Sequence, residues 1–226
     1  MLKGKKAVIF DMDGSLVDSM WVWLEVDRIY MEKHRLTAPE TFHKDIEGMS
    51  YIETAQYFVD TFDSLERTRE EVMQDWRDMA VDLYATRVFP KPGAVDFLDE
   101  MRRRGVLLGI ATSNDRKIAQ AALDARGLNK YFVSVCTSSE VASGKPAPDM
   151  YLKVAGDLGV HPSECLVFED IPNGILAGKN AGMVVCAVDD DFSRRDEQEK
   201  KRLADYYIRD FYEIMNKTYE RCGGLE

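Results

Sequence analysis

The chain has 226 residues, 45% of them hydrophobic, and its 40 acidic side chains against 30 lysines and arginines give a formal net charge of −10. This length lies between one large domain and two small ones, and the apolar content is enough to build a sizeable core. The acidic balance argues against nucleic acid or an anionic membrane as a partner, because both bind clustered lysine and arginine. We therefore expect a monomer whose partner is a small soluble molecule.

The first apolar run, residues 7–10, stops at Asp11 and is too short for a signal peptide. No other segment is long enough to span a membrane. The cysteines show no CxxC spacing and the chain has only 3 histidines, which favours free thiols over disulfides or a zinc site. We therefore expect a cytoplasmic protein with its four cysteines reduced, namely Cys136, Cys165, Cys186 and Cys222.

In chain order, the first predicted element is a strand at residues 7–10. From about residue 16 to 88 the pattern contains helix signals and no predicted strand. An amphipathic stretch runs from Ser19 to His34, and capping-box sequences begin at Ser50 and Thr68, the second opening a helix toward Ala85. The run FPKPG, residues 89–93, is typical of a stiff linker.

Strands and helices alternate from residue 93 onward. Two helical patterns, residues 93–105 and 115–127, each end at a glycine, as helices commonly do. The strand-like runs are mostly apolar without alternation, which is typical of strands covered on both faces. They span residues 106–112, 131–136, 165–169, 184–188 and, more weakly, 206–208.

This order of elements predicts an α/β fold with a doubly wound, Rossmann-like parallel sheet, because strand–helix alternation requires right-handed crossovers. We predict a core domain made of residues 1–15 and 90–226. Residues 16–89 are predicted to form an all-helical domain inserted after the first strand.

Polar side chains follow four of the predicted strands. Parallel strands bring their carboxyl ends to one edge of a sheet, where α/β proteins bind ligands. Each group alone has an ordinary explanation as a turn, a helix cap, a polar loop or a strand end, but together they predict a functional site. The candidates are Asp11, Asp13, Gly14, Thr112, Ser113, Asn114, Lys145, Glu169 and Asp170.

The charges of this cluster indicate what it binds. Its four carboxylates outnumber its single lysine, Lys145, so an anion would be repelled unless a cation is present. Oxygen ligands without nearby histidine or cysteine favour Mg²⁺, which commonly also binds a substrate phosphate. An EF-hand calcium loop is excluded because Leu16 and Val22 occupy the positions of its glycine and its bidentate glutamate.

The remaining polar groups suit a phosphate. Lys145 and the Thr112 hydroxyl can hold phosphate oxygens, and backbone amides after Gly14 or near Ser113 can add donors. Near-period-2 spacing can aim Asp11 and Asp13 into one crevice as the strand ends. Gly14 would keep a Cβ out of the phosphate's path.

Four segments, DMDGSLVDS, ATSND, GKPAPD and FEDIPNGILAGKNAG, resemble in order and spacing the four motifs of the haloacid dehalogenase (HAD) superfamily. The resemblance is to the subgroup with a helical cap after the first motif, which includes β-phosphoglucomutase-like phosphatases and mutases. It covers essentially the whole core, whereas the cap is similar only in position and helicity. Ser15 and Ile171 stand where the family more often has threonine and serine.

The resemblance implies a Mg²⁺-dependent hydrolase of a small phosphorylated metabolite. In it, Asp11 is the nucleophile that forms an aspartyl-phosphate, and Asp13 is the acid and base. Thr112 and Lys145 bind the transferring phosphoryl group. The metal ligands are implied to be Asp11, the Asp13 carbonyl and Asp170, with Glu169 at or near the metal. The residues themselves do not distinguish a nucleophilic Asp11 from a purely ligating one.

The helical insert is interpreted as a lid with hinges near residues 15–17 and 89–92. Candidate substrate contacts are Trp21, Trp23 and the turn EGMSY, residues 47–51, which contains Met49. Packing inside the lid is the more common role for residues such as Trp21 and Met49. His34 and His43 are expected at the surface.

Three functions stay open at this stage. The leading one is a phosphatase acting on a sugar phosphate or a similar ester. The second is a phosphosugar mutase that uses the same aspartyl-phosphate, although the resemblance places a histidine early in the first insert helix, and the stretch SMWVWLEVDR, residues 19–28, has none and carries Trp23 at about that place. The third is a non-catalytic sensor of a phosphorylated ligand on the same fold. Dehalogenation is disfavoured, because it needs neither Asp13 nor a metal.

Overall fold

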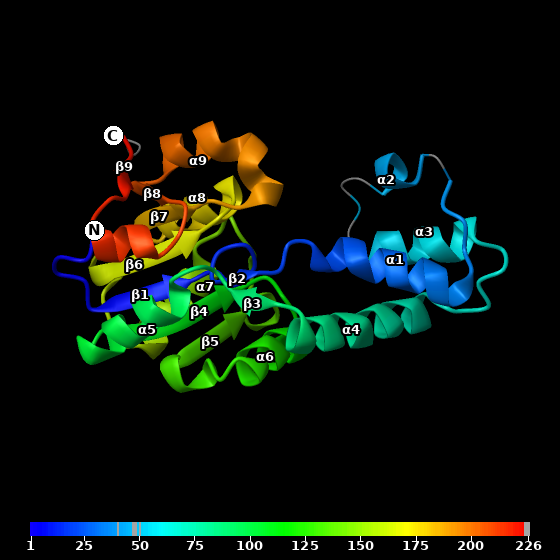
Figure 1. Ribbon diagram of the computed structural model, residues 1–226, viewed down its shortest axis with the longest axis horizontal. Helices are drawn as coiled ribbons and strands as arrows, with labels where there is room; N and C mark the ends of the chain where they lie inside the picture. The colour runs from blue at the N-terminus through cyan, green and yellow to red at the C-terminus, as the bar shows by residue number, and fades with distance from the viewer. Residues whose placement is uncertain (40, 47–48, 50, 224–226) are drawn as a thin grey trace.

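A twisted sheet and a separate group of helices make up the computed structural model, which describes residues 1–39, 41–46, 49 and 51–223 (Figure 1). The strands of the main sheet are β1 Ala7–Phe10, β4 Leu107–Thr112, β5 Ser134–Thr137, β6 Cys165–Glu169, β7 Val184–Val188, β8 Tyr206–Ile208 and β9 Glu220–Arg221. Two further strands, β2 Val17–Asp18 and β3 Phe89–Pro90, pair with each other. The predicted α/β class is confirmed.

The strand order places β1 at the centre of the sheet. Within the described residues the order is β5-β4-β1-β6-β7-β8-β9, and all neighbours are parallel except β8 and β9. Ala7 is in register with Leu107 on one side and Cys165 on the other. From β1 the chain first builds outward through β4 and β5, then returns to build the other half from β6. A ligand crevice is expected beside such a reversal point, at the carboxyl end of β1.

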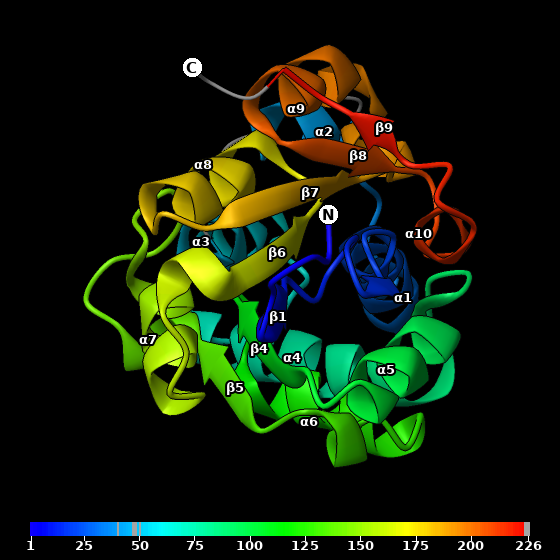
Figure 2. The same cartoon turned by 90° about the vertical axis from the view of Figure 1, so that its left-hand side faces the viewer.

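Helices cover both faces of the sheet (Figure 2). One face packs against α5 Ala94–Arg103, α6 Arg116–Ala125 and α10 Tyr212–Asn216. The other packs against α7 Asp149–Asp157, α8 Pro172–Asn180 and α9 Glu197–Leu203. Short 3₁₀ turns span Asn129–Tyr131, Ser138–Glu140, Pro162–Glu164 and Asp191–Asp196.

Strand β1 shows why the apolar runs lack alternation. Val8 and Phe10 enter the core on the α5 and α6 face, whereas Ala7 and Ile9 enter the core on the α7 and α8 face. All four side chains are fully buried, as expected for a central strand. The Phe10 ring stacks on Phe168 of the neighbouring strand, with ring centroids 5.2 Å apart.

The segment between β2 and β3 is helical and lies to one side of the sheet (Figure 1). Its helices are α1 Val22–His34, α2 Phe42–Asp45, α3 Tyr51–Thr61 and α4 Arg69–Thr86. Tyr30, Phe58 and Trp76 form its aromatic centre, and the rings of Phe58 and Trp76 lie 4.9 Å apart. We call α1 to α4 with their connecting loops the cap.

The capping box predicted at Thr68 is confirmed. The Thr68 amide donates to Glu71 Oε2 at 2.8 Å, and the Glu71 amide donates to Thr68 Oγ1 at 3.3 Å. The other box was predicted to begin at Ser50, which lies outside the described residues, as do Glu47 and Gly48 of the predicted turn and the side chain of His43.

Several boundaries differ from the prediction. The expectation of no strand between about residues 16 and 88 was wrong, since β2 falls there, but a two-residue strand leaves no side-chain periodicity. Tyr131 starts no strand, because it lies in a 3₁₀ turn and its hydroxyl donates to Asp99 at 2.7 Å. The antiparallel β9 was missed. The first cap helix begins at Val22 and not at Ser19.

Three further expectations concern the histidines, the cysteines and the membrane. His34 is half-buried and not fully at the surface, because its ring packs at a tilt against Tyr30, with ring centroids 4.4 Å apart, and its side chain is 17% exposed. All four cysteines are free thiols, as expected. In the part of the chain that the structure describes, none of the helices combines the length and apolar character needed to cross a bilayer.

Candidate active site

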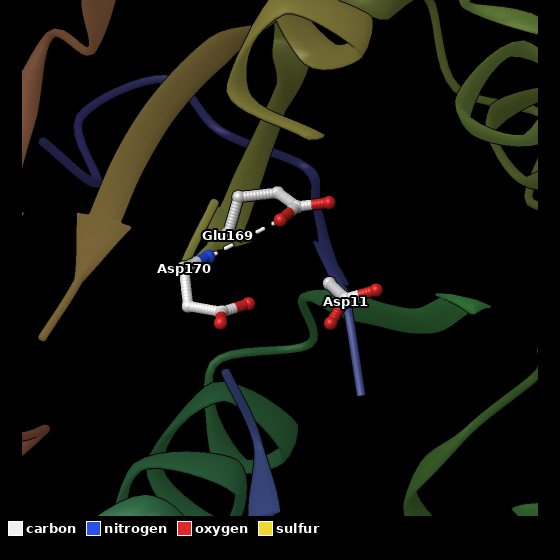
Figure 3. A group of neighbouring side chains, drawn as sticks. All are labelled: Asp11, Glu169 and Asp170. Carbon is white, nitrogen blue, oxygen red and sulfur yellow. Dashed lines mark hydrogen bonds between the residues drawn. The ribbon is translucent and has the colours of Figure 1, made fainter. Parts of the chain in front are cut away.

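Three carboxylates from two neighbouring strands meet at the carboxyl edge of the sheet. Asp11 follows β1, Glu169 ends β6 and Asp170 comes next, and each offers an oxygen within 4.8 Å of the others (Figure 3). The Asp11 amide donates to Phe168 O at 2.9 Å, which fixes the two strand ends side by side. The three residues are buried, so their charges are poorly screened by water.

Lys145 supplies a positive charge to this group. Its Nζ contacts Asp11 Oδ1 and lies 2.6 Å from Glu169 Oε1. Burial alone would lower the pKa of Lys145, but Asp11 and Glu169 raise it, so the ammonium stays charged. Burial raises the pKa of Asp11 well above its usual range, and the neighbouring carboxylates add to this, although Lys145 opposes it. One lysine therefore does not balance the cluster.

Glu169 and Asp170 differ in how completely their carboxylate oxygens are hydrogen-bonded. Glu169 Oε1 accepts from the Tyr151 hydroxyl at 2.6 Å, and Oε2 accepts from the Asp170 amide at 3.1 Å. Asp170 Oδ1 accepts from the Ser15 hydroxyl at 3.0 Å, whereas its buried Oδ2 has no hydrogen-bond partner among the described residues. Burial first, and then the charge of Glu169, raise the pKa of Asp170 to about 7.

An unpartnered buried carboxylate oxygen is costly unless a cation or donor reaches it. Asp170, whose Oδ2 is free, belongs with Asp11 and Glu169 to an all-oxygen cluster with excess negative charge, which suits a hard divalent cation such as Mg²⁺. The residues present therefore fit the predicted metal.

Asp13 lies close to a different set of groups. Its Oδ1 accepts from the Ser19 hydroxyl at 2.6 Å and from the Tyr84 hydroxyl at 2.5 Å. Its Oδ2 accepts from Asn114 Nδ2 at 3.1 Å, and the Thr112 hydroxyl lies 3.4 Å away. Tyr84 belongs to α4, so the last turn of this cap helix directly contacts Asp13, the second aspartate of the first motif.

Gly14 lies against the Asp170 carboxylate, whereas the sequence predicted that its missing side chain leaves space for a phosphate. Its φ of +76° lies in the left-handed region, where a side chain is strained. A Cβ built there would collide with Asp170 Oδ2 and approach Met20 Cγ to 3.1 Å. The missing side chain therefore makes room for the Asp170 carboxylate.

A cavity of about 710 Å³ lies between the cap and the core. Core residues Asp13, Ser113 and Asn114 line one end, and its cap side includes Trp23 and Met49. The expectation that Met49 packs inside the cap is wrong, since it is 37% exposed and faces the cavity. Trp21 is partly buried against the hydrophobic core and does not line the cavity.

The structure also brings in residues that sequence reasoning missed. Ser19 belongs to the first motif, where it has no expected role, although it donates to Asp13. Tyr151 comes shortly after the lysine motif, and Tyr84 shortly before the return linker, so their closeness to these motifs was the available signal. Asp27, on α1, also lines the cavity.

The structure therefore combines a doubly wound sheet with an inserted helical cap, and it places an acidic cluster with one lysine at the end of β1. A family model described as "haloacid dehalogenase-like hydrolase" matches residues 5–182. The chain belongs to this family, as its four motifs predicted.

Similar proteins support the assignment. The chain is 32% identical over 181 residues to the phosphorylated carbohydrates phosphatase of Thermotoga maritima, covering 79% of this chain and 82% of that one. It is 34% identical to hexitol phosphatase A of Escherichia coli, covering 81% and 82%. The crystal structure of CbbY from Rhodobacter sphaeroides in complex with phosphate covers 98% of this chain and 97% of its own, with a TM-score of 0.77 and 22% identity. That last likeness concerns the fold alone.

Proposed function

We propose that the protein is a Mg²⁺-dependent phosphatase that hydrolyses a small phosphomonoester through an aspartyl-phosphate on Asp11. The observation that carries the proposal is the buried group of Asp11, Glu169 and Asp170 with Lys145 beside it, where Asp170 Oδ2 lacks a partner among the described residues. The names of the similar phosphatases support the reaction class.

Asp11 and Asp170 would hold the metal, with the Asp13 carbonyl as the further ligand that the family resemblance implies. Glu169 is the weaker candidate for a direct ligand, because Lys145, Tyr151 and the Asp170 amide already contact its oxygens. The metal, when bound, would neutralise phosphate charge and so let a phosphate approach Asp11.

In the first step, an Asp11 oxygen attacks phosphorus and the bond to the ester oxygen breaks. Asp13 gives that leaving oxygen a proton, so an alcohol departs. In the second step, Asp13 takes a proton from water, which attacks phosphorus, and inorganic phosphate leaves Asp11. Lys145 and the Thr112 hydroxyl would stabilise the equatorial phosphoryl oxygens.

Hydrolysis is favoured over transfer to a second hydroxyl of the same sugar. Among described residues lining the cavity there is no histidine or lysine, and Trp23 takes the place expected for the histidine that would relay a proton. The one guanidinium among them, that of Arg77, already donates to Gln74 at 3.2 Å and lies 4.0 Å from Asp115. ³¹P NMR on hexose 1-phosphates with a trace of bisphosphate decides the point. Faster formation of a 6-phosphate than of free phosphate would favour the mutase.

The domain division, with a core of residues 1–15 and 90–226 and a cap of residues 16–89, belongs to the same proposal. The cavity is lined from both sides, so movement of the cap about the paired strands β2 and β3 would open and close it. Closure would exclude water during the first step, and opening would release the alcohol.

The test is phosphate release from a panel of phosphomonoesters, with Mg²⁺ and with EDTA. We expect turnover only with the metal, and we expect Asp11→Asn to remove it by several orders of magnitude while the fold is kept. Circular dichroism checks the fold of the variant. More than about a tenth of wild-type activity in Asp11→Asn would overturn the nucleophile assignment; release by none of the esters would favour a sensor.

A further inference from the structure

Asp27 is a cap carboxylate that the proposed reaction does not use. It lies on α1 and lines the cavity together with Trp23, one helical turn before it on the same helix face. No residue in the described ranges donates a hydrogen bond to it or forms an ion pair with it. Burial raises its pKa to about 6. The Asp27 carboxylate therefore has acceptor positions free to bind a ligand in the cavity.

Aromatic side chains form the wall next to Asp27. The Trp23 and Tyr51 rings meet edge to face with centroids 5.6 Å apart, and Tyr51 meets Trp76 in the same way at 5.7 Å. All three line the cavity, and Trp23 remains 38% exposed. Such a wall suits the C–H face of a polyol or the face of an organic cation.

The charges of the cavity disfavour a second anion. Asp13, Asp27 and Asp115 line it against one guanidinium among the described residues, that of Arg77. That guanidinium is already occupied in part, because its Nη1 donates to Gln74 at 3.2 Å and its Nε lies 4.0 Å from Asp115 Oδ2. The volume of about 710 Å³ leaves room for a leaving group well beyond the phosphate.

We infer that Asp27 selects the leaving group of the substrate: its carboxylate accepts a hydrogen bond from a hydroxyl or ammonium group of a phosphomonoester that carries no second anion. The inference rests on the proposed phosphatase activity and adds the substrate class. In this arrangement the phosphate of the substrate lies near Asp13 and Asn114, and its hydroxyl or ammonium group lies beside α1 of the cap.

The experiment compares four esters with the full-length protein in saturating Mg²⁺. Sorbitol 6-phosphate carries hydroxyls, phosphoethanolamine an ammonium and phosphoglycolate a second anion, and p-nitrophenyl phosphate serves as the reference. The measured quantity is kcat/KM for each ester divided by kcat/KM for the reference. The variants are Asp27→Ala, the isosteric Asp27→Asn and, as a control, Asp63→Asn, an exposed cap carboxylate.

For an ester with a donor, Asp27→Ala should lower this ratio about 10- to 100-fold, the loss of one hydrogen bond to a charged group. The ratio for phosphoglycolate should rise, and Asp63→Asn should change no ratio. Asp27→Asn separates the two donors: the amide still accepts from a hydroxyl, so sorbitol 6-phosphate should lose less than phosphoethanolamine.

Ratios within about threefold of wild type for both donor esters in Asp27→Ala would overturn the inference while leaving the phosphatase intact. A wild-type preference for phosphoglycolate over both donor esters would overturn it as well. Absence of wild-type turnover on all four esters would instead overturn the proposed function, and this inference with it.

Discussion

Replacing Tyr84 with phenylalanine should slow turnover about 10- to 100-fold with little change in KM. The substitution removes only the hydroxyl that donates to Asp13 Oδ1 at 2.5 Å and accepts from Asn114 Nδ2 at 2.9 Å. Burial and the adjacent Asp13 raise the pKa of Tyr84, so the phenol is protonated and acts as the donor. A hydrogen bond to a charged group contributes about 1.5–3 kcal/mol, and about 1.36 kcal/mol corresponds to a factor of ten.

Under the proposed mechanism the loss should appear in kcat, because Asp13 would face the leaving oxygen, whereas the proposed phosphate contacts of Lys145 and Thr112, which would set KM, are unchanged. Asn114 keeps its bond to Asp13 Oδ2 at 3.1 Å, so no donor is orphaned. Steady-state phosphate release gives kcat and KM, and urea unfolding separates any loss of stability. Tyr57→Phe, which removes a hydroxyl bonded to Asp45 elsewhere in the cap, is the matched control. A kcat within about threefold of wild type would refute the reasoning.

Three other changes give defined outcomes. Asp170→Ala should raise the Mg²⁺ concentration for half-maximal activity at least about tenfold, which a metal titration of activity measures. Gly14→Ala should destabilise the fold by about 1–2 kcal/mol, because φ is +76° and the Cβ collides with Asp170; urea unfolding measures this, and an unchanged midpoint would contradict it. Burial raises the pKa of Asp27 in the folded protein to about 6, so folding favours the protonated carboxyl. Its contribution to the free energy of unfolding is therefore present below about pH 4 and is lost as the pH rises through 6. Asp27→Asn should therefore stabilise the protein at pH 7.5 by on the order of 1–2 kcal/mol, and not at pH 4, in thermal or urea unfolding.

The core could be predicted because its signals are local. The apolar runs β1, β6 and β7 have the bounds that were expected, since a central parallel strand must be apolar on both faces. The carboxylates that end β1 and β6 follow from the same rule, because neighbouring parallel strands place their ends together. The amino-acid pattern alone therefore predicts that Asp11, Glu169 and Asp170 lie at one edge of the sheet, and the pairing of β1 with β6 makes them neighbours.

Contacts that depend on how the cap sits on the core could not be predicted. Tyr84 is 71 residues from Asp13, and their pairing depends on the orientation of α4. Asp27 has the sequence pattern of an ordinary polar position on an amphipathic helix, and only the cavity distinguishes it. The two-residue strands β2 and β3 are defined by backbone pairing, and such pairing leaves no pattern in the side chains.

The pairing of β2 with β3 also bears on how such a protein evolves. Val17 lies opposite Pro90 and Asp18 opposite Phe89, so the chain leaves the core and returns to it at adjacent points. An insertion between neighbouring points disturbs the rest of the fold least, because the strand order and register of the sheet are unaffected. The catalytic edge of the sheet and the intervening helices can therefore vary at different rates. The same sheet can therefore carry caps of different sequence, because the chain enters and leaves the cap at the two adjacent residue pairs of β2 and β3.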